Sequence, residues 1–265
     1  MKSDFDMIVR RFPDRPNIKI YPIADVHLGA IECMEDKWNK FCSMIAKDEN
    51  AYLMIAGDLI NNGIRNGVGN PFEQVYRPRE QKRLMIEMLH PLRDKILCMV
   101  GGNHERRTDK DTDSSPAYDI AAKLDLEDVY RENIAFVKLQ MGDSKGSGES
   151  NPTYTFAVAH GFGSSIYTTN AAMRAERFGM AIDGIDCMIA GHIHKPQQFP
   201  VGKYVVDKYN EKVTIKPFEV FICTSWMEGS GYSIQKMLQP VAFKLRHLTL
   251  RGNKKLIGDA SDDDF

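Results

Sequence analysis

Short apolar runs, each closed by a polar residue, alternate with amphipathic stretches along the first half of the chain. Residues 18–24, 52–56 and 96–100 are runs of this kind, and their length and composition predict buried strands. Residues 34–47 and 79–93 carry apolar side chains at helical spacing, which predicts helices with one buried face. This alternation favours an α/β arrangement in which helices cover a sheet.

The second half of the chain is richer in predicted strands. They are expected at residues 134–141, 153–159, 187–190, 204–206, 212–216, 219–223 and 241–250. Helices are expected at 116–124, where Pro116 suits a first turn, and at 170–181. We therefore expect an α/β or α+β fold with a mixed sheet, in one domain over residues 1–257. The acidic end, residues 258–265, is expected to be a disordered tail.

Composition and charge remove several functional classes. The 265 residues are 43% hydrophobic and 27% charged, which is enough apolar material for a sizeable core. A formal net charge of −1 excludes a cationic surface spread over the whole domain, while a local basic patch stays open. Five cysteines without a CxxC pair argue against a disulfide framework and fit a reducing compartment. Without a signal peptide or a long apolar run, we expect a cytoplasmic protein that does not enter a membrane.

Polar motifs follow directly after five of the predicted strands, and they contain five of the seven histidines. The motifs are Asp25-Val26-His27, Gly57-Asp58, Gly102-Asn103-His104-Glu105, His160-Gly161 and Gly191-His192-Ile193-His194. One such motif is common by chance, but an ordered set of five at strand ends is not. Because ligands bind beyond the carboxyl ends of strands in open α/β sheets, these motifs mark the expected site.

The residue types in these motifs are those of a transition-metal site. Alternate residues of an extended segment point to the same face, so Asp25 and His27 can act together, as can His192 and His194. Carboxylate and imidazole ligands suit Mn, Fe or Zn better than Ca or Mg. A carboxylate such as Asp58 can bridge two cations, and two cations about 3.5–4 Å apart can clamp both oxygens of a phosphoryl displacement.

In their order and spacing, the five motifs resemble the calcineurin-like metallophosphoesterase superfamily over about residues 18–196. The resemblance implies a β-sandwich of two mixed sheets flanked by helices, with a two-metal site at one edge. It also implies a hydrolase in which two divalent metals, expected to be Mn with Fe, Zn or Ni as alternatives, generate a hydroxide that attacks phosphorus in line. His104 is expected beside the scissile phosphate, where it donates a proton to the leaving oxygen or stabilises the charge there.

The resemblance also implies a ligand set. The expected ligands are Asp25, His27 and His194 for the first metal, the bridging Asp58 for both, and Asn103, His160 and His192 for the second. One position departs from the family pattern. Many members have an acid three residues after the bridging Asp, where this chain has Asn61, followed by Asn62-Gly63. We expect altered support of the ligands at this point, without loss of metal.

The motif details favour a phosphodiester substrate, either a nucleotide or a nucleic-acid bond. The segment Asp25-Val26-His27-Leu28-Gly29 resembles the phosphodiesterase side of the superfamily, and Asn61-Asn62-Gly63 replaces the Asp-Arg-Gly of its protein phosphatases. The near-zero net charge argues against a nuclease for long duplexes, so a cyclic nucleotide, a dinucleotide or a short nucleic-acid end fits at least as well. The alternatives are a phosphomonoesterase acting on nucleotides or proteins, and a non-catalytic metal-binding scaffold.

Three arginines are candidates for contacts with the substrate. Arg106 follows the Glu of the third motif, as in the Ser/Thr phosphatase version, and a guanidinium can hold phosphate bidentately. Arg77 and Arg174 lie near aromatic residues, a combination that can hold phosphate and stack a base. A solvated surface is the alternative for these arginines, because acidic residues are interleaved with Arg77 and Arg174.

Overall fold

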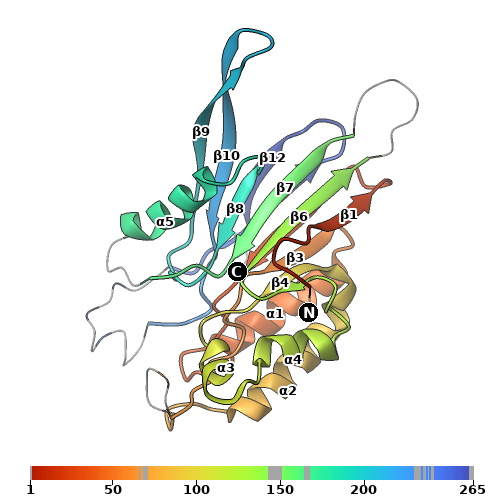
Figure 1. Ribbon diagram of the computed structural model, residues 1–265. Coiled ribbons are helices and arrows are strands. Elements are labelled where there is room, and N and C mark those ends of the chain that lie inside the picture. The colour runs from red at the N-terminus through yellow and green to blue at the C-terminus, as the bar shows by residue number, and fades with distance from the viewer. Residues whose placement is uncertain are drawn as a thin grey trace.

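The computed structural model describes residues 2–65, 67, 71–142, 151–163, 168–229, 234, 237, 239 and 242–262. Over these ranges the chain forms two six-stranded sheets that pack against each other, with helices on their outer faces (Figure 1). Both sheets contain parallel and antiparallel pairs, so the predicted sandwich of two mixed sheets flanked by helices is confirmed. Within the same ranges, none of the helices combines the length and the apolar composition that crossing a bilayer requires.

The first sheet has the strand order β12-β11-β2-β3-β4-β5. Its strands are β2 (Asn17–Ile23), β3 (Ala51–Ile55), β4 (Ile96–Val100), β5 (Tyr130–Arg131), β11 (Leu245–Arg251) and β12 (Ile257–Asp262). The central strands β2, β3 and β4 are parallel and almost wholly buried. Strands covered on both faces become continuous apolar runs, which is why the sequence pattern identifies these three well.

The second sheet has the strand order β1-β6-β7-β8-β10-β9. Its strands are β1 (Ile8–Phe12), β6 (Ile134–Met141), β7 (Thr153–Ala159), β8 (Cys187–Ala190), β9 (Gln197–Asp207) and β10 (Lys212–Ile222). Strands β7 and β8 are parallel, so their carboxyl ends lie together. They meet the carboxyl ends of β2, β3 and β4 at one edge of the sandwich.

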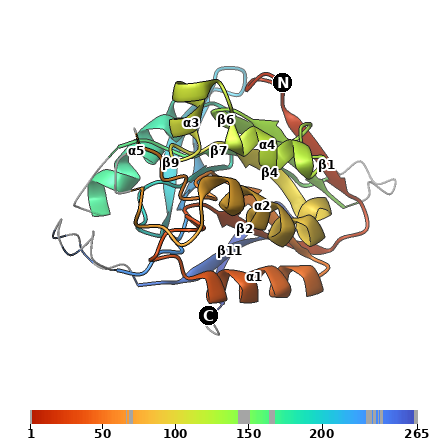
Figure 2. The same ribbon diagram turned by 90° about the horizontal axis from the view of Figure 1, so that it is seen from below.

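Helices cover both outer faces. On the first sheet lie α1 (Glu35–Lys47), α2 (Pro78–Leu89), the 3₁₀ helix η1 (His90–Lys95) and α4 (Pro116–Lys123). Figure 2 shows α1, α2 and α4 side by side. Helix α5 (Thr168–Met180) packs on β8 and β10 of the second sheet. The short helix α3 (Arg106–Thr112) starts just after the third motif. The predicted helix 79–93 is broken at its end because Pro91 cannot continue α-helical hydrogen bonding.

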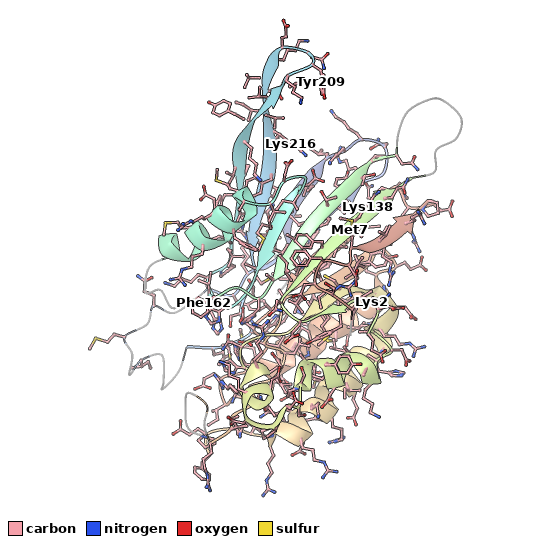
Figure 3. The ribbon with its side chains drawn as sticks, in the orientation of Figure 1. Lys2, Met7, Lys138, Phe162, Tyr209 and Lys216 are labelled. Carbon is pink, nitrogen blue, oxygen red and sulfur yellow. The ribbon has the colours of Figure 1, made fainter. Side chains whose placement is uncertain are left out.

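The hairpin of β9 and β10 replaces three shorter predicted strands. The two strands pair over eleven residues, and the distal part of the hairpin stands clear of the body, with Tyr209 and Lys216 exposed on it (Figure 3). The sequence suggests a break near Pro217, which lacks a backbone donor. Strand β8 pairs with β10 only from Glu219 onward, so the N-terminal half of β10 is an edge on that side and tolerates proline.

The acidic end of the chain is more ordered than its composition suggests. Residues 258–262 were expected in a disordered tail, but they lie in β12, which pairs with β11 from Leu250↔Ile257 to Leu245↔Asp262. Ile257 packs against the main core, and backbone pairing does not depend on side-chain charge. The expectation is therefore corrected for these five residues, and residues 263–265 lie outside the described ranges.

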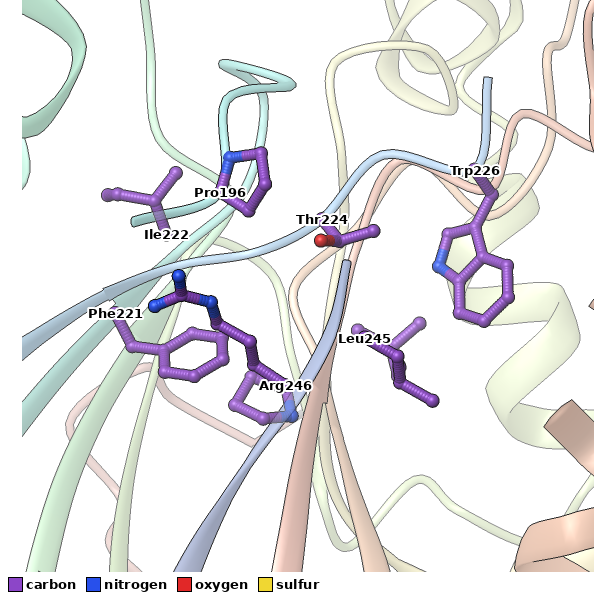
Figure 4. A pocket seen from close by; sticks show the side chains of 9 residues that line it. Pro196, Phe221, Ile222, Thr224, Trp226, Leu245 and Arg246 are labelled. Atoms are coloured by element: carbon purple, nitrogen blue, oxygen red, sulfur yellow. The ribbon is translucent and has the colours of Figure 1, made fainter. Parts of the chain in front are cut away.

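An aromatic cluster joins α1 to the segment that supports the site. Trp38 of α1 is fully buried, and its ring lies 5.0 Å from that of Trp226, centre to centre. Trp226 in turn donates its backbone N–H to the carbonyl of Asp25 at 3.0 Å. Trp226 also lies beside a narrow crevice between the sheets, near Thr224 and Arg246 (Figure 4). Packing of α1 is thus coupled to the end of β2.

Replacing Trp38 by alanine is expected to lower the free energy of unfolding by about 3–5 kcal/mol, because it leaves a large cavity in a packed aromatic cluster. Urea unfolding followed by fluorescence and circular dichroism measures the change. The matched control is Asn39→Ala, at an exposed position of the same helix, for which we expect a change within about 0.5 kcal/mol. Equal effects of the two substitutions would contradict the coupling of α1 to the core.

Candidate metal centre

The polar motifs meet at the shared edge of the two sheets. The candidate residues follow β2 (Asp25, His27), β3 (Asp58), β4 (Asn103, His104), β7 (His160) and β8 (His192, His194). Backbone hydrogen bonds continue past the strand ends and fix these segments to one another. The N–H of Asp25 donates to the carbonyl of Gly57 at 3.1 Å, and the N–H of Gly191 to that of His160 at 3.0 Å.

Five of the candidate residues have a backbone in the left-handed region. The φ angles are +56° at Asp25, +49° at His27, +52° at Asp58, +70° at His192 and +56° at His194. A non-glycine residue at such an angle costs about 1–3 kcal/mol, and it persists only where its surroundings hold it. Ten described non-glycine residues have positive φ, and these five are half of them. The fold accepts this strain where the chain turns these side chains toward one another.

One group of side chains combines a carboxylate with two imidazoles. Asp25, His27 and His194 each offer a ligand atom, and these atoms lie within 4.8 Å of one another. The Nε2 of His194 is 3.4 Å from Oδ1 of Asp25, and the Nε2 of His27 is 3.9 Å from the same oxygen. The two Nε2 atoms are only 3.1 Å apart. Asp25 and His27 are almost completely buried.

A second group lies against the first. Its members Asp58, His160 and His192 also have ligand atoms within 4.8 Å of one another. The amide oxygen of Asn103 is 2.8 Å from Nε2 of His160 and 2.6 Å from Nδ1 of His192. Asp58 connects the groups, because its Oδ2 lies 3.2 Å from Nε2 of His160 and 3.8 Å from Nε2 of His27.

The protonation of His160 shows that these groups suit a cation. Its Nδ1 lies 2.7 Å from the carbonyl of Ala56, so Nδ1 carries the proton and donates it there. In the neutral ring, Nε2 then presents a lone pair toward the oxygens of Asp58 and Asn103, which are acceptors as well. Three electron-rich atoms directed at one point match the donor set of a divalent transition metal. With only protons present, burial lowers the pKa of His160, but Asp58 outweighs it and raises the pKa to about 9.

The charge on Asp58 is held in place by the surrounding imidazoles. Burial raises the pKa of this carboxyl group, but the nearby His160 and His104 outweigh it and hold the pKa well below its usual range. The ring of His27 behaves in the opposite way, since burial and the neighbouring His104 lower its pKa well below the usual value. A charged carboxylate beside a neutral imidazole, as with Asp58 and His27, is the state in which both can bind metal.

Glu105, which carries no role in the sequence analysis, ties two of the site segments together. Its buried carboxylate accepts backbone N–H bonds from Asp58, Ile60 and Gly102, each 3.1 Å long. These donors come from the segments that follow β3 and β4. Gly102 must be glycine here, because a Cβ would collide with Oδ1 of Asp58. Burial and the charge of Asp58 raise the pKa of Glu105 to about 7.

His104 stands beside both groups and makes its own contacts. Its Nδ1 lies 2.7 Å from the carbonyl of Asn61, and its Nε2 lies 2.8 Å from Nη2 of Arg107 and 3.9 Å from Oδ2 of Asp58. Burial outweighs the opposing charge of Asp58 and lowers the pKa of His104 to about 4, and the positive charge of Arg107 adds to this lowering. The neutral ring therefore has its proton on Nδ1 and its lone pair on Nε2.

Asn61 and Asn62, where the chain departs from the family pattern, hold His104 in position. Asn61 contributes its carbonyl to His104, whereas the side chain of Asn62 is buried and donates to the carbonyl of His104 at 2.7 Å and to Oγ1 of Thr108 at 2.8 Å. The N–H of Asn62 donates to the buried side chain of Gln81 at 2.8 Å. Sequence reasoning misses Asn62 and Gln81 as supporting residues, and a pair of buried amides on distant segments leaves no spacing signal.

The three arginines expected at the substrate make no described contact with this cluster. Arg106 donates from Nη2 to the carbonyl of Glu132 at 2.7 Å. Arg77 is exposed just before α2, and Arg174 lies over the ring of Phe162 and donates to its carbonyl at 2.9 Å. The arginine that reaches the cluster is Arg107, and its spacing of three residues from His104 is the signal that could have identified it.

Glu105→Gln is expected to destabilise the protein by about 1–3 kcal/mol, because an amide cannot accept from all three backbone donors and brings its own N–H groups toward them. The shift in thermal unfolding midpoint measures the loss. Glu127→Gln, at an exposed position, is the control and should leave the midpoint unchanged. An unshifted midpoint for Glu105→Gln would show that this carboxylate does not hold the two segments together.

Solved structures of several bacterial proteins are distantly similar to this chain. They include a predicted phosphoesterase from Streptococcus pneumoniae TIGR4 (10% identity, 94% of this chain and 99% of that chain, TM-score 0.35) and the NAD nucleotidase of Haemophilus influenzae (9%, 92% and 49%, TM-score 0.41). A third is the nuclease MPE of Pseudomonas putida (16%, 91% and 87%, TM-score 0.33). None of the curated proteins compared with the chain matches it.

The family assignment rests on a family model and not on these distant structures. The model of the calcineurin-like phosphoesterases matches residues 18–196, which is more than half of the chain and includes every candidate ligand. Membership implies a hydrolase that acts on phosphoesters, and the two groups of imidazoles and carboxylates suit its dinuclear metal site. The chain belongs to the calcineurin-like phosphoesterase family.

Proposed function

We propose that this protein is a two-metal phosphodiesterase that hydrolyses a nucleotide or nucleic-acid phosphodiester. The observation that carries the proposal is the position of Asp58, whose Oδ2 lies between Nε2 of His27 in one group and Nε2 of His160 in the other. A carboxylate oxygen shared by two groups of imidazoles is the geometry of a bridging ligand. A single-metal or purely structural site needs no such shared oxygen.

The proposed ligands follow from the two groups. Asp25, His27 and His194 would hold one cation, Asp58 would be shared by both, and Asn103, His160 and His192 would complete the second position. Mn suits this mixture of imidazole, carboxylate and amide oxygen, and Fe, Zn or Ni fit the same donors. When bound, the two ions supply Lewis-acid activation of water and offset charge on the phosphoryl oxygens.

The residues of this chain orient the substrate and manage its protons. His104 presents Nε2 toward the cluster, and its Nδ1–H is fixed by the carbonyl of Asn61, so the ring cannot rotate freely. We propose that His104, when it carries a proton on Nε2, donates that proton or a hydrogen bond to the leaving oxygen as the P–O bond breaks. The buried amide of Asn62 holds the backbone carbonyl of His104 and so fixes where the ring stands.

The preference for a diester rests on the sequence around the ligands. The segment Asp25-Val26-His27-Leu28-Gly29 is similar to the phosphodiesterase side of the family. Asn61-Asn62-Gly63 occupies the position of the phosphatase Asp-Arg-Gly, and here the side-chain amide of Asn62 supports His104. No arginine is therefore available at that position to hold a dianionic monoester.

The function is tested by comparing bis-(p-nitrophenyl) phosphate with p-nitrophenyl phosphate as substrates of the Mn-loaded protein. We expect a higher kcat/KM for the diester, and release of nucleotides from single-stranded DNA, RNA or a cyclic nucleotide in the same assay. Asp58→Asn is expected to abolish this activity and to lower the bound metal, measured by mass spectrometry, from about two ions per chain. Asp14→Asn, at an exposed position, should change neither. A preference for the monoester would make the protein a phosphomonoesterase.

His104→Ala is expected to reduce kcat about 10²- to 10⁴-fold while both metals stay bound. The reduction should be smallest for activated leaving groups such as p-nitrophenolate, which depart without a proton, and largest for alkyl leaving groups. A series of diesters with leaving groups of different pKa measures this dependence. If good and poor leaving groups lose the same factor, His104 does not act on the leaving oxygen.

A further inference from the structure

Arg107 brings a positive charge to the edge of the candidate metal centre. Its Nη2 lies 2.8 Å from Nε2 of His104, the ring atom that faces the cluster, and its Nη1 lies 3.3 Å from the carbonyl of Asn61. The first residue of α3 is Arg106, so Arg107 stands in the first turn of that helix, one turn after His104. Its side chain is half-buried.

Gly67, which follows β3 in the chain, lies beside the stem of Arg107. A Cβ built on Gly67 would lie 3.1 Å from Cδ and 3.6 Å from Nε of Arg107, so the backbone of Gly67 packs directly on this side chain. The side chain of Arg107 is thereby confined by Gly67 along its stem and by His104 at its tip. A side chain confined in this way loses little conformational entropy when it binds a ligand.

The guanidinium has donors to spare and no carboxylate bonded to it, although the charges of Asp58 and Glu105 act on it from further away. Of its five N–H groups, the described contacts use one for a ring nitrogen and one for a weak bond to a carbonyl. Among the described residues, no carboxylate lies within 4.0 Å of it. Other arginines of the chain differ: Arg83 pairs with Glu87 at 2.7 Å and Arg93 with Asp125 at 3.2 Å. A confined cation whose best acceptor is a neutral ring nitrogen is arranged to receive an anion.

We propose that Arg107 binds the phosphoryl oxygens of the substrate. In doing so it gives up its hydrogen bond to the ring nitrogen of His104. The inference rests on the proposed function and adds to it a residue that holds the phosphoryl group beside His104. A phosphoryl oxygen is charged and accepts from two N–H groups of the fork, whereas Nε2 of His104 accepts only one. No covalent bond changes in this exchange.

The exchange also prepares His104 for its own step. In this structure the lone pair of Nε2 accepts from Arg107, so this nitrogen cannot donate a proton to anything. Once a phosphoryl group draws the guanidinium away, Nε2 no longer holds this bond and is free to face the leaving oxygen. Substrate binding by Arg107 and leaving-group assistance by His104 are therefore linked through this hydrogen bond.

The test compares Arg107→Ala, Arg107→Lys and a control, Lys110→Ala, which removes an exposed positive charge one turn further along α3. Inorganic phosphate is titrated by calorimetry into the metal-free and the Mn-loaded protein. For Arg107→Ala we expect Kd for phosphate and KM for bis-(p-nitrophenyl) phosphate to rise roughly tenfold to a hundredfold. Arg107→Lys should recover part of this loss, because it restores the charge without the planar fork. Lys110→Ala should match the wild type.

Two further readouts separate this role from others. Metal content and unfolding midpoint of Arg107→Ala should equal those of the wild type, and its loss of kcat/KM should be the same for good and poor leaving groups, unlike that of His104→Ala. A loss that grows with the leaving-group pKa would assign Arg107 to the leaving oxygen and overturn the proposal. Unchanged phosphate affinity and unchanged KM would overturn it as well.

The outcome is distinguishable from a failure of the proposed function. If the wild type hydrolyses no phosphoester, the proposed function is wrong, and the phosphate titration still decides whether Arg107 binds an anion. If the wild type is active and Arg107→Ala has the same Kd for phosphate and the same KM, the proposed phosphodiesterase activity is supported and the proposed role of Arg107 is wrong.

Discussion

Electron-rich side chains from two sheets face one another at one edge of this protein, closer together than their own chemistry favours. Two imidazole nitrogens lie 3.1 Å apart, and the lone pair of His160 faces the oxygens of Asp58 and Asn103. Such an arrangement is costly in a buried site unless protons or cations occupy it. The left-handed backbone at five of these residues adds to the cost. The packed strands beneath the site, and the carboxylate of Glu105 between two of its segments, oppose this repulsion.

Much of the arrangement can be predicted from the sequence, because it depends on strand ends. Parallel buried strands are recognisable as apolar runs, and the residues that follow them must share an edge, so the sequence pattern alone places Asp25, Asp58 and Asn103 together. The strands β9 and β12 are harder to find. One is exposed along its distal part, and the other is acidic, so neither has the apolar pattern that burial imposes.

Supporting residues are also hard to find, and for a different reason. Whether Arg106 or Arg107 points toward the site depends on the orientation of α3. This helix has seven polar residues and no apolar face, so its sequence does not show which side is buried. Asn62 and Gln81 meet across nineteen residues of sequence through a backbone N–H. Contacts of this kind follow from loop geometry, which local propensity does not determine.

The candidate ligands come from both layers of the sandwich, and this has a mechanical consequence. Asp25, Asp58 and Asn103 belong to one sheet, and the histidines after β7 and β8 belong to the other. An ion bound among them would link the two sheets, so part of its binding free energy would oppose separation of the sheets. The stability of the sandwich would then depend on the concentration of metal around the protein, as its activity does.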